Sequence, residues 1–158
     1  MTKLTIDEHL TEDDPTLQLE NNLCFSLYVT SRELINRYTP ALSEIGLTYT
    51  QYVTMMVLWQ EKEVLTRELR DRLFLDSGTL TPVLKKLEEK GLITKERSKA
   101  DARDVIVTLT AEGLGLKEKA KTVQTQVSKS LVGLQDFSQL MADLQQMMAF
   151  FERQRKEN

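Results

Sequence analysis

Apolar residues recur at helical spacing over most of the chain. The first such run extends from about Thr16 to Thr39, and two more lie in the last third of the chain. A spacing of three or four residues between apolar positions is typical of amphipathic helices. We expect Pro40 to interrupt the first helix, because proline lacks the N–H that a helix interior uses. After a short helix ended by Gly46, Thr50 is expected to cap a helix that is apolar on most sides and therefore buried.

In the middle of the chain, the spacing of apolar residues changes from a helical period to a strand period. Residues 65–73 predict a short helix, residues 76–79 a turn, and the next residues a second helix that ends near Lys90 with Gly91 in the C-terminal glycine position. Apolar and polar residues then alternate in 92–97 and 104–110, which predicts two strands around a polar loop. A helix, a second helix and a β-hairpin in this order indicate a winged helix-turn-helix.

The predicted fold class is therefore mainly α with a small β-hairpin wing. The expected divisions are a flexible acidic tail (1–15), N-terminal helices (16–49), a winged helix-turn-helix DNA-binding region (50–110) and C-terminal helices (111–158) with a break at 133–136. A winged unit needs only about half of this length, so the remaining amphipathic helices must cover their apolar faces elsewhere. A second copy of the chain is the simplest partner, which makes both sets of helices dimerisation helices. The alternative is packing within one subunit.

Charge is distributed unevenly along the 158 residues, although the net charge is only −3. Residues 1–20 hold one basic and six acidic side chains, whereas residues 62–103 hold eleven basic and eight acidic ones. A locally basic centre allows one surface to meet phosphates. No apolar run approaches the ~20 residues that span a bilayer, and Met1–Pro15 lacks a secretory pattern. We expect a cytoplasmic protein with no membrane partner.

The chain contains one cysteine, Cys24, and one histidine, His9. A single cysteine excludes an intrachain disulfide framework and a cysteine-cluster zinc site. One histidine in an acidic tail also argues against a nucleophile–histidine pair. We therefore expect no metal, no cofactor and no enzymatic activity. A thiol peroxidase built on Cys24 remains the enzyme alternative, but it would lack a resolving cysteine and a catalytic histidine.

The second helix of the pair offers a surface suited to DNA. Its exposed positions are predicted to be Ser77, Thr79, Thr81, Pro82, Lys85 and Lys86. Small hydroxyl residues allow close approach to base edges and phosphates, and the lysines supply charge for the backbone. In the hairpin loop, Lys99 and Arg103 suit a narrow minor groove, and Asp101 is placed to brace the guanidinium of Arg103. The alternative is an ordinary solvated surface.

The stretch LDSGTLTPVLKKLEEKGLITKERSKADARDV, followed by LTAEG, resembles the MarR family of winged-helix regulators. Leu75–Gly91 matches the recognition helix, Leu92–Asp104 the strand and wing, and Leu109–Gly113 the start of the helix that returns to the dimer interface. The resemblance implies a homodimer held by interdigitated N- and C-terminal helices. It also implies binding to an inverted-repeat operator in double-stranded DNA, with recognition helices in major grooves and wings in adjoining minor grooves.

Residues 23–28, Tyr38 and residues 47–52 further resemble the organic-hydroperoxide-sensing branch of that family. The resemblance implies that Cys24 is the redox sensor and that two tyrosines of the other subunit hydrogen-bond to it. These tyrosines correspond to Tyr38 and Tyr49, and Tyr28 also matches.

Geometry supports part of this assignment. Cys24 and Tyr28 are four residues apart and share a helix face, whereas Tyr38 lies about 21 Å from Cys24 along a straight helix. A contact between them requires a second chain or a sharp bend. A helix that starts at Thr16 would place Cys24 two turns from its N-terminus, where the helix dipole is weak.

The hypothesis is a redox-sensing regulator, expected to be a repressor, that leaves its operator when organic hydroperoxide oxidises Cys24 to sulfenic acid. Because no resolving cysteine is present, a low-molecular-weight thiol, cyclisation or overoxidation must follow. Two alternatives keep the fold: a repressor that responds to a small aromatic ligand, with Cys24 structural, and a protein-interaction module that does not bind DNA.

Overall fold

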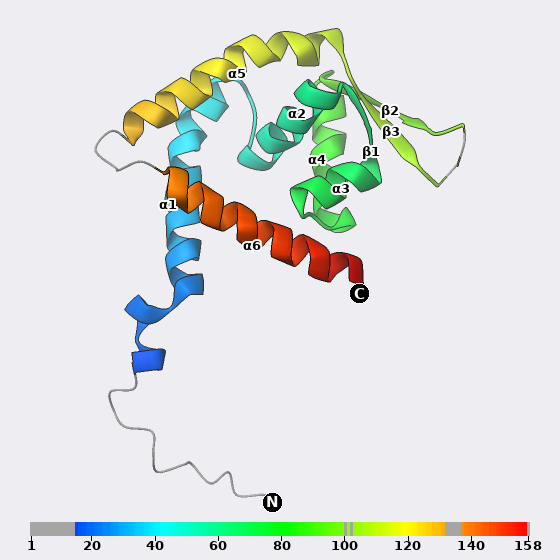
Figure 1. Cartoon of the computed structure of the whole chain (residues 1–158). Helices are drawn as coiled ribbons and strands as arrows, with labels where there is room; N and C mark the ends of the chain where they lie inside the picture. The colour runs from blue at the N-terminus through cyan, green and yellow to red at the C-terminus, as the bar shows by residue number, and fades with distance from the viewer. Residues whose placement is uncertain (1–14, 100, 102, 132–136, 158) are drawn as a thin grey trace, which may run out of the picture. The chain divides into compact units, whose positions relative to one another are not determined.

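The computed structural model describes residues 15–99, 101, 103–131 and 137–157. After two 3₁₀ turns, Pro15–Leu17 and Leu19–Asn21, the elements are α1 (Leu23–Glu44), α2 (Tyr49–Glu61), β1 (Glu63–Leu65), α3 (Thr66–Leu73), α4 (Ser77–Glu89), β2 (Ile93–Arg97), β3 (Val105–Leu109), α5 (Ala111–Ser130) and α6 (Ser138–Glu157) (Figure 1). This mainly helical architecture with a small hairpin confirms the predicted fold class. The predicted break at 133–136, and all of the predicted tail except Pro15, lie outside the described residues.

Helix α1 differs from its prediction at both ends. It begins at Leu23 rather than near Thr16, because the Asn22 side chain caps it by accepting a hydrogen bond from the Phe25 N–H at 2.8 Å. It then continues through Pro40 to Glu44, so the predicted break is wrong. Pro40 is exposed, and the carbonyl that its missing N–H leaves unpaired is therefore not forced to remain dry.

Helix α2 is the centre of the core, as its apolar sequence predicts. Met55 and Leu58 are completely buried in it, and Trp59 is 8% exposed. Its N-cap is Thr48 rather than Thr50, because Thr48 and Gln51 form a reciprocal capping box. Burying this helix on most of its sides supplies much of the apolar area from which the first part of the chain gains its stability.

The helix-turn-helix is formed by α3 and α4. Phe74 ends α3 in the left-handed conformation, with φ of 54°, and the Asp76 side chain caps α4 by accepting from the Thr79 N–H at 2.7 Å. Gly91 follows α4 with φ of 72°, which confirms its predicted role as the C-terminal glycine.

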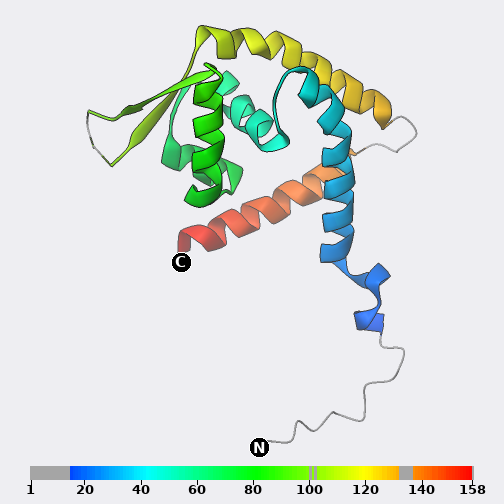
Figure 2. The ribbon, with the colours of Figure 1, turned by 180° about the vertical axis from the view of Figure 1, so that it is seen from behind.

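The sheet contains a strand that the sequence pattern did not reveal. Its order is β1-β3-β2, fully antiparallel, with Val64 of β1 opposite Val107 of β3. Strand β1 has three residues, too few for the alternation of apolar and polar positions to be recognised. The hairpin of β2 and β3 extends beyond α3 and α4 in both views (Figures 1 and 2).

The first turn of α5 is fixed to both α2 and the sheet. Thr110 caps it by accepting from the Gly113 N–H at 3.0 Å. The indole Nε1–H of Trp59 donates to the Gly113 carbonyl oxygen at 2.8 Å. A Cβ on Gly113 would lie 2.1 Å from the Leu92 carbonyl oxygen. Only glycine therefore allows α5 to approach the start of β2 this closely.

Residues 1–127 and 128–158 form two compact units. In the second unit, large apolar side chains are at least 37% exposed at Phe137, Leu140, Met141, Met148, Phe150 and Phe151. None of the helices that the structure describes combines the length and the apolar composition needed to cross a bilayer.

Gly113→Ala is expected to lower the free energy of unfolding by about 1–3 kcal/mol or more, because its methyl group overlaps backbone that cannot move independently. Gly115→Ala is the matched control. Nothing lies within 4 Å of a Cβ at Gly115, so alanine there should raise helix stability by roughly 0.5–1 kcal/mol. Urea denaturation of the two variants measures both effects. Equal stability of the two variants would contradict the close approach of α5 to β2.

Candidate functional site

The outer side of α4 carries all of the predicted DNA-reading residues of that helix. Six of them are exposed: Ser77, Thr79, Thr81, Pro82, Lys85 and Lys86. The Thr81 hydroxyl donates to the Ser77 carbonyl at 2.7 Å, and the Thr79 hydroxyl donates to an Asp76 carboxylate oxygen at 3.1 Å. Both threonine hydroxyl protons are therefore used inside the helix, and the hydroxyl oxygens can still accept from a DNA base or from water.

The sequence did not predict two features at the start of α4. Hydrogen bonds from the Thr79 backbone and side chain lower the pKa of Asp76, so its charge stays at the N-terminus of the helix. Arg70 of α3 also approaches Ser77, with 3.5 Å between its Nη1 and the Ser77 hydroxyl oxygen. The cluster of three arginines in α3, next to a predicted recognition helix, is the sequence signal that could have identified Arg70.

The hairpin tip presents one arginine in a fixed orientation. The side chain of Arg103 is 90% exposed, and its Nε and Nη2 donate to the carboxylate of Asp101 at 3.1 and 2.8 Å. The side chain and the backbone N–H of Arg103 lower the pKa of Asp101, which keeps the carboxylate ionised. The predicted bidentate brace is present, and Lys99 is exposed on the same loop.

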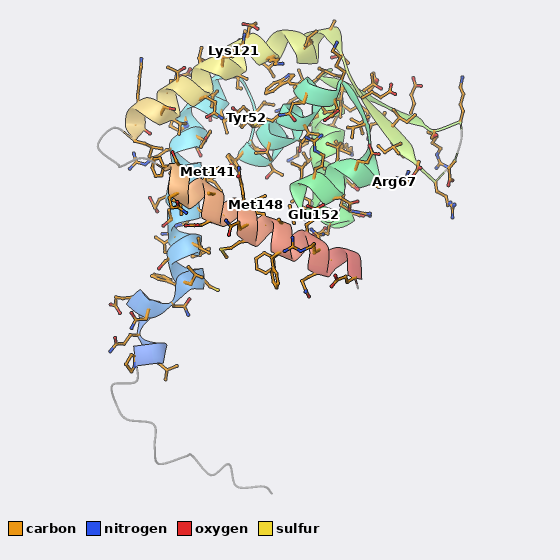
Figure 3. All side chains as sticks on the ribbon, viewed as in Figure 1. Tyr52, Arg67, Lys121, Met141, Met148 and Glu152 are labelled. Carbon is orange, nitrogen blue, oxygen red and sulfur yellow. The ribbon has the colours of Figure 1, made fainter. Side chains whose placement is uncertain are left out.

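The base of the hairpin is attached to α3. The Thr66 hydroxyl donates to the Val105 carbonyl at 3.1 Å, and Arg67 pairs with Asp104 at 3.4 Å. Arg67 is labelled at the start of α3 in Figure 3. The hairpin and the helix-turn-helix therefore share direct contacts, which attach the base of the hairpin to α3.

A cluster of aromatic rings joins α1 to α2. The centroids of Tyr38 and Tyr49 are 5.3 Å apart, and those of Tyr38 and Tyr52 are 6.1 Å apart. Tyr52, which is labelled on α2 in Figure 3, also lies 6.1 Å from the ring of Trp59. Tyr52 was not among the predicted residues, although its position three residues after Tyr49 places both on one face of a helix.

The two tyrosines of α2 retain their protons. Burial raises the pKa of Tyr49 above its usual value, and the nearby Tyr38 and Tyr52 raise it further. Burial also raises the pKa of Tyr52, and a hydrogen bond from Gln124 of α5 partly opposes that shift. Both groups are therefore neutral phenols at physiological pH and can donate hydrogen bonds.

Cys24 lies far from this cluster within the chain. It is the second residue of α1 and is exposed, so the expectation that it lies two turns inside the helix is wrong. The position is that of a first-turn residue, where the helix dipole favours negative charge. Fourteen residues of continuous helix separate Cys24 from Tyr38, a distance of about 21 Å. A single chain therefore brings Tyr38 and Tyr49 together without Cys24.

The surroundings of Cys24 are apolar and open. Its neighbours Leu23 and Phe25 are 62% and 39% exposed. Tyr28, one turn further along, is 62% exposed, and the guanidinium of Arg32 lies 5.6 Å from its ring centroid. Within the described residues there is no group of three or more histidine, cysteine or acidic side chains arranged to hold a metal ion. His9 lies outside the described residues.

The chain has recognisable relatives. Residues 36–120 match the family "Transcriptional regulator SarA/Rot". The organic hydroperoxide resistance transcriptional regulator of Bacillus subtilis is 47% identical over 104 residues, which are 66% of this chain and 71% of that protein. The HTH-type transcriptional regulator SarZ of Staphylococcus haemolyticus is 47% identical over 109 residues, 69% of this chain and 74% of its own.

A solved structure agrees with these relatives. Reduced AbfR, a Staphylococcus epidermidis protein, was determined bound to DNA and is 31% identical, with a TM-score of 0.74 over 88% of this chain and 96% of its own. The chain therefore belongs to the MarR-type winged helix-turn-helix transcriptional regulators, in the branch that includes the organic hydroperoxide resistance regulators.

Proposed function

We propose that this DNA-binding, redox-sensing regulator acts as a homodimer on an inverted-repeat operator, as a repressor, and is released when an organic hydroperoxide oxidises Cys24. The observation that carries this proposal is the separation inside one subunit. The tyrosines that match the sensor pattern form a packed cluster, but the cysteine is about 21 Å away along the same helix. A second chain completes the sensor.

Exposed apolar surface supports the dimer. At the N-terminal end of α1, Leu17, Leu19 and Leu23 are each at least 55% exposed. In the second unit, the exposed apolar residues of α6 provide another such surface. Apolar clusters of this kind indicate a protein partner, and two identical chains would cover both surfaces symmetrically.

The DNA contacts follow from the arrangement of α4 and the hairpin. The small exposed residues of α4 suit the major groove, and Lys85 and Lys86 suit the phosphates that border it. The braced guanidinium of Arg103 is narrow and positively charged, which suits a narrow minor groove. Together with Lys99, these residues would supply most of the salt-dependent part of the affinity.

The proposed chemistry is a thiolate attack on the peroxide. The sulfur of Cys24 forms a bond to the distal oxygen of the hydroperoxide while the O–O bond breaks, and the alkoxide leaves as an alcohol after taking up a proton. Two electrons pass from sulfur to the peroxide, and a sulfenic acid remains. A low-molecular-weight thiol can then form a mixed disulfide with the release of water. Hydrogen bonds from Tyr38 and Tyr49 of the partner subunit would stabilise the thiolate before the attack.

Packing offers a route from the sulfur to the DNA-reading elements. The tyrosine cluster contacts Trp59, whose indole N–H holds the Gly113 carbonyl next to the start of β2. A larger, uncharged sulfur group beside Tyr38 and Tyr49 would displace rings that are packed against this joint. Cores change between discrete packings rather than deforming smoothly. The distance between the DNA-binding units of the two chains, each formed by α4 and the hairpin, would therefore change.

The variant Cys24→Ser is expected to bind operator DNA with an affinity within about twofold of the wild-type value. Cumene hydroperoxide should weaken wild-type binding about 5- to 150-fold, the usual range of coupling between two sites, and should leave Cys24→Ser unchanged. Fluorescence anisotropy with labelled operator, before and after treatment, measures both. Release of Cys24→Ser by the peroxide would remove this residue from the mechanism.

Mixed dimers of two variants test whether Cys24 and Tyr38 pair between chains or within one chain. Neither Cys24→Ser nor Tyr38→Phe homodimers contain a complete cysteine–tyrosine pair. If the pair forms between chains, a heterodimer of the two variants regains one complete pair and its rapid oxidation. If the pair formed within one chain, the mixture would oxidise no faster than the separate variants.

The variant Arg103→Ala should weaken operator binding about tenfold and reduce the slope of log affinity against log salt by about one, because one phosphate-region cation is lost. Lys119→Ala, which removes one positive charge from an exposed position on α5, is the matched control and should leave both quantities near the wild-type values. Binding titrations at several salt concentrations provide the measurement. An unchanged slope for Arg103→Ala would place the hairpin tip away from the DNA.

A second candidate function follows from a cavity of about 270 Å³ between α2 and α5. Its lining includes Tyr52, Met56, Trp59, Lys117 and Lys121, a combination of aromatic walls and cations that suits a small aromatic carboxylate. Quenching of Trp59 fluorescence by such a compound, with loss of operator binding and indifference to peroxide, would favour this function over the redox mechanism.

A further inference from the structure

Gln124 of α5 joins the two helices that carry the tyrosine cluster. Its side-chain Oε1 accepts a hydrogen bond from the Tyr38 hydroxyl of α1 at 3.4 Å. Its Nε2 donates to the Tyr52 hydroxyl of α2 at 2.9 Å. The amide of Gln124 therefore accepts a hydrogen bond from Tyr38, a proposed sensor tyrosine, and donates one to Tyr52, the buried tyrosine beside it.

A phenol has one proton and can donate one full hydrogen bond at a time. When Tyr38 donates to Gln124, it cannot also donate to a sulfur in the dimer interface. The two acceptors differ in strength, because a hydrogen bond to an ionised acceptor is roughly twice as strong as a neutral one. The distance of 3.4 Å to Gln124 is near the upper limit of a hydrogen bond, so this bond is easily exchanged.

We propose that Gln124 is a positioning residue that competes with the Cys24 thiolate of the partner subunit for the hydroxyl proton of Tyr38. This inference rests on the proposed function, because it requires the two-chain sensor. While the sulfur is an anion, Tyr38 donates to it. Once oxidation removes the negative charge, the Tyr38 hydroxyl again donates to the Gln124 oxygen, and Gln124 then connects α1, α5 and α2.

The surroundings limit what else can move. The ring of Tyr38 is held between Tyr49 and Tyr52, so exchange of its acceptor requires rotation about the C–O bond and only a small displacement of the ring. The neighbouring ionisable groups in the described part of the chain include these two phenols, together with Lys117 and Lys121, which line the same cavity as Gln124. A charged substitution at position 124 would also act on those groups, so the decisive variant must be neutral.

Gln124→Met keeps the length of the side chain and removes both its acceptor for Tyr38 and its donor to Tyr52. Without the competitor, more Tyr38 hydroxyl is available to the thiolate. We expect the second-order rate constant for sulfenic acid formation with cumene hydroperoxide at pH 7 to rise about two- to fivefold, from the low end of the net strength of one hydrogen bond. Gln124→Glu, a stronger acceptor, should lower this rate constant by a similar factor.

The variant Tyr38→Phe tests whether Gln124 acts through the hydroxyl group of Tyr38. In Tyr38→Phe, the further change Gln124→Met should have no effect on the rate constant, because the shared proton is gone, and this non-additivity is what direct coupling requires. If Gln124→Glu still lowers the rate constant in the Tyr38→Phe background, that remaining decrease measures the electrostatic effect of the carboxylate alone. Rapid mixing, with the sulfenic acid trapped and quantified by mass spectrometry, gives the rate constants of the wild type, Gln124→Met and Gln124→Glu with and without Tyr38→Phe.

Gln126→Met is the matched control on the same helix. Gln126 is exposed, and its amide donates to Glu44 rather than to a tyrosine, so its loss should leave the rate constant unchanged. If the wild-type protein does not react with the peroxide, the proposed function fails. If the wild-type protein reacts but Gln124→Met is unchanged, slower, or equally effective in the Tyr38→Phe background, only the competition is overturned.

Discussion

The arrangement of this protein depends on the joint between α2 and the first turn of α5. The Trp59 indole reaches the Gly113 carbonyl, and the absence of a side chain at Gly113 lets the helix start against the backbone of Leu92. This joint connects the buried core helix, the return helix and the base of the hairpin at one place. A change in the packing of α2 therefore reaches the hairpin through short, stiff contacts rather than through a flexible linker.

The sequence was sufficient for the elements that have a clear period or a clear stop signal. Helix α4 was predicted from its apolar face and Gly91, although residues 77–79, which were predicted as a turn, form its first turn. The hairpin was predicted from alternation on both sides of a polar loop. Strand β1 was missed because three residues carry no period. The start of α1 was misplaced because the apolar spacing continues upstream of Leu23, whereas the cap formed by Asn22 depends on local geometry. The predicted break at Pro40 was wrong. The free energy lost with one hydrogen bond at an exposed turn does not outweigh the free energy gained from the contacts of Ala41 and Leu42, which are buried immediately after it.

Some residues of the candidate site could be predicted from the sequence, and others could not. The spacing of Asp101 and Arg103 predicted a pair that is present, and the tyrosines that match the family pattern stay predicted sensor residues. Tyr52 and Gln124 were not predicted, because their roles come from contacts between residues that are 72 positions apart. A glutamine on an amphipathic helix has no local feature that separates it from its neighbours. Pairing of this kind is set by tertiary structure and is visible only after the helices are packed.

The proline within α1 has a mechanical consequence. The turn around Pro40 lacks one of the hydrogen bonds that stiffen a helix, and it lies between Tyr38 and the buried residues that anchor the C-terminal end of α1 in the core. Bending stiffness is therefore lowest next to the tyrosine that is proposed to sense the other chain. The part of α1 that carries Cys24 can bend at this turn while Ala41 and Leu42 stay buried, so its fit to the proposed partner chain can adjust without exposing these two anchoring residues.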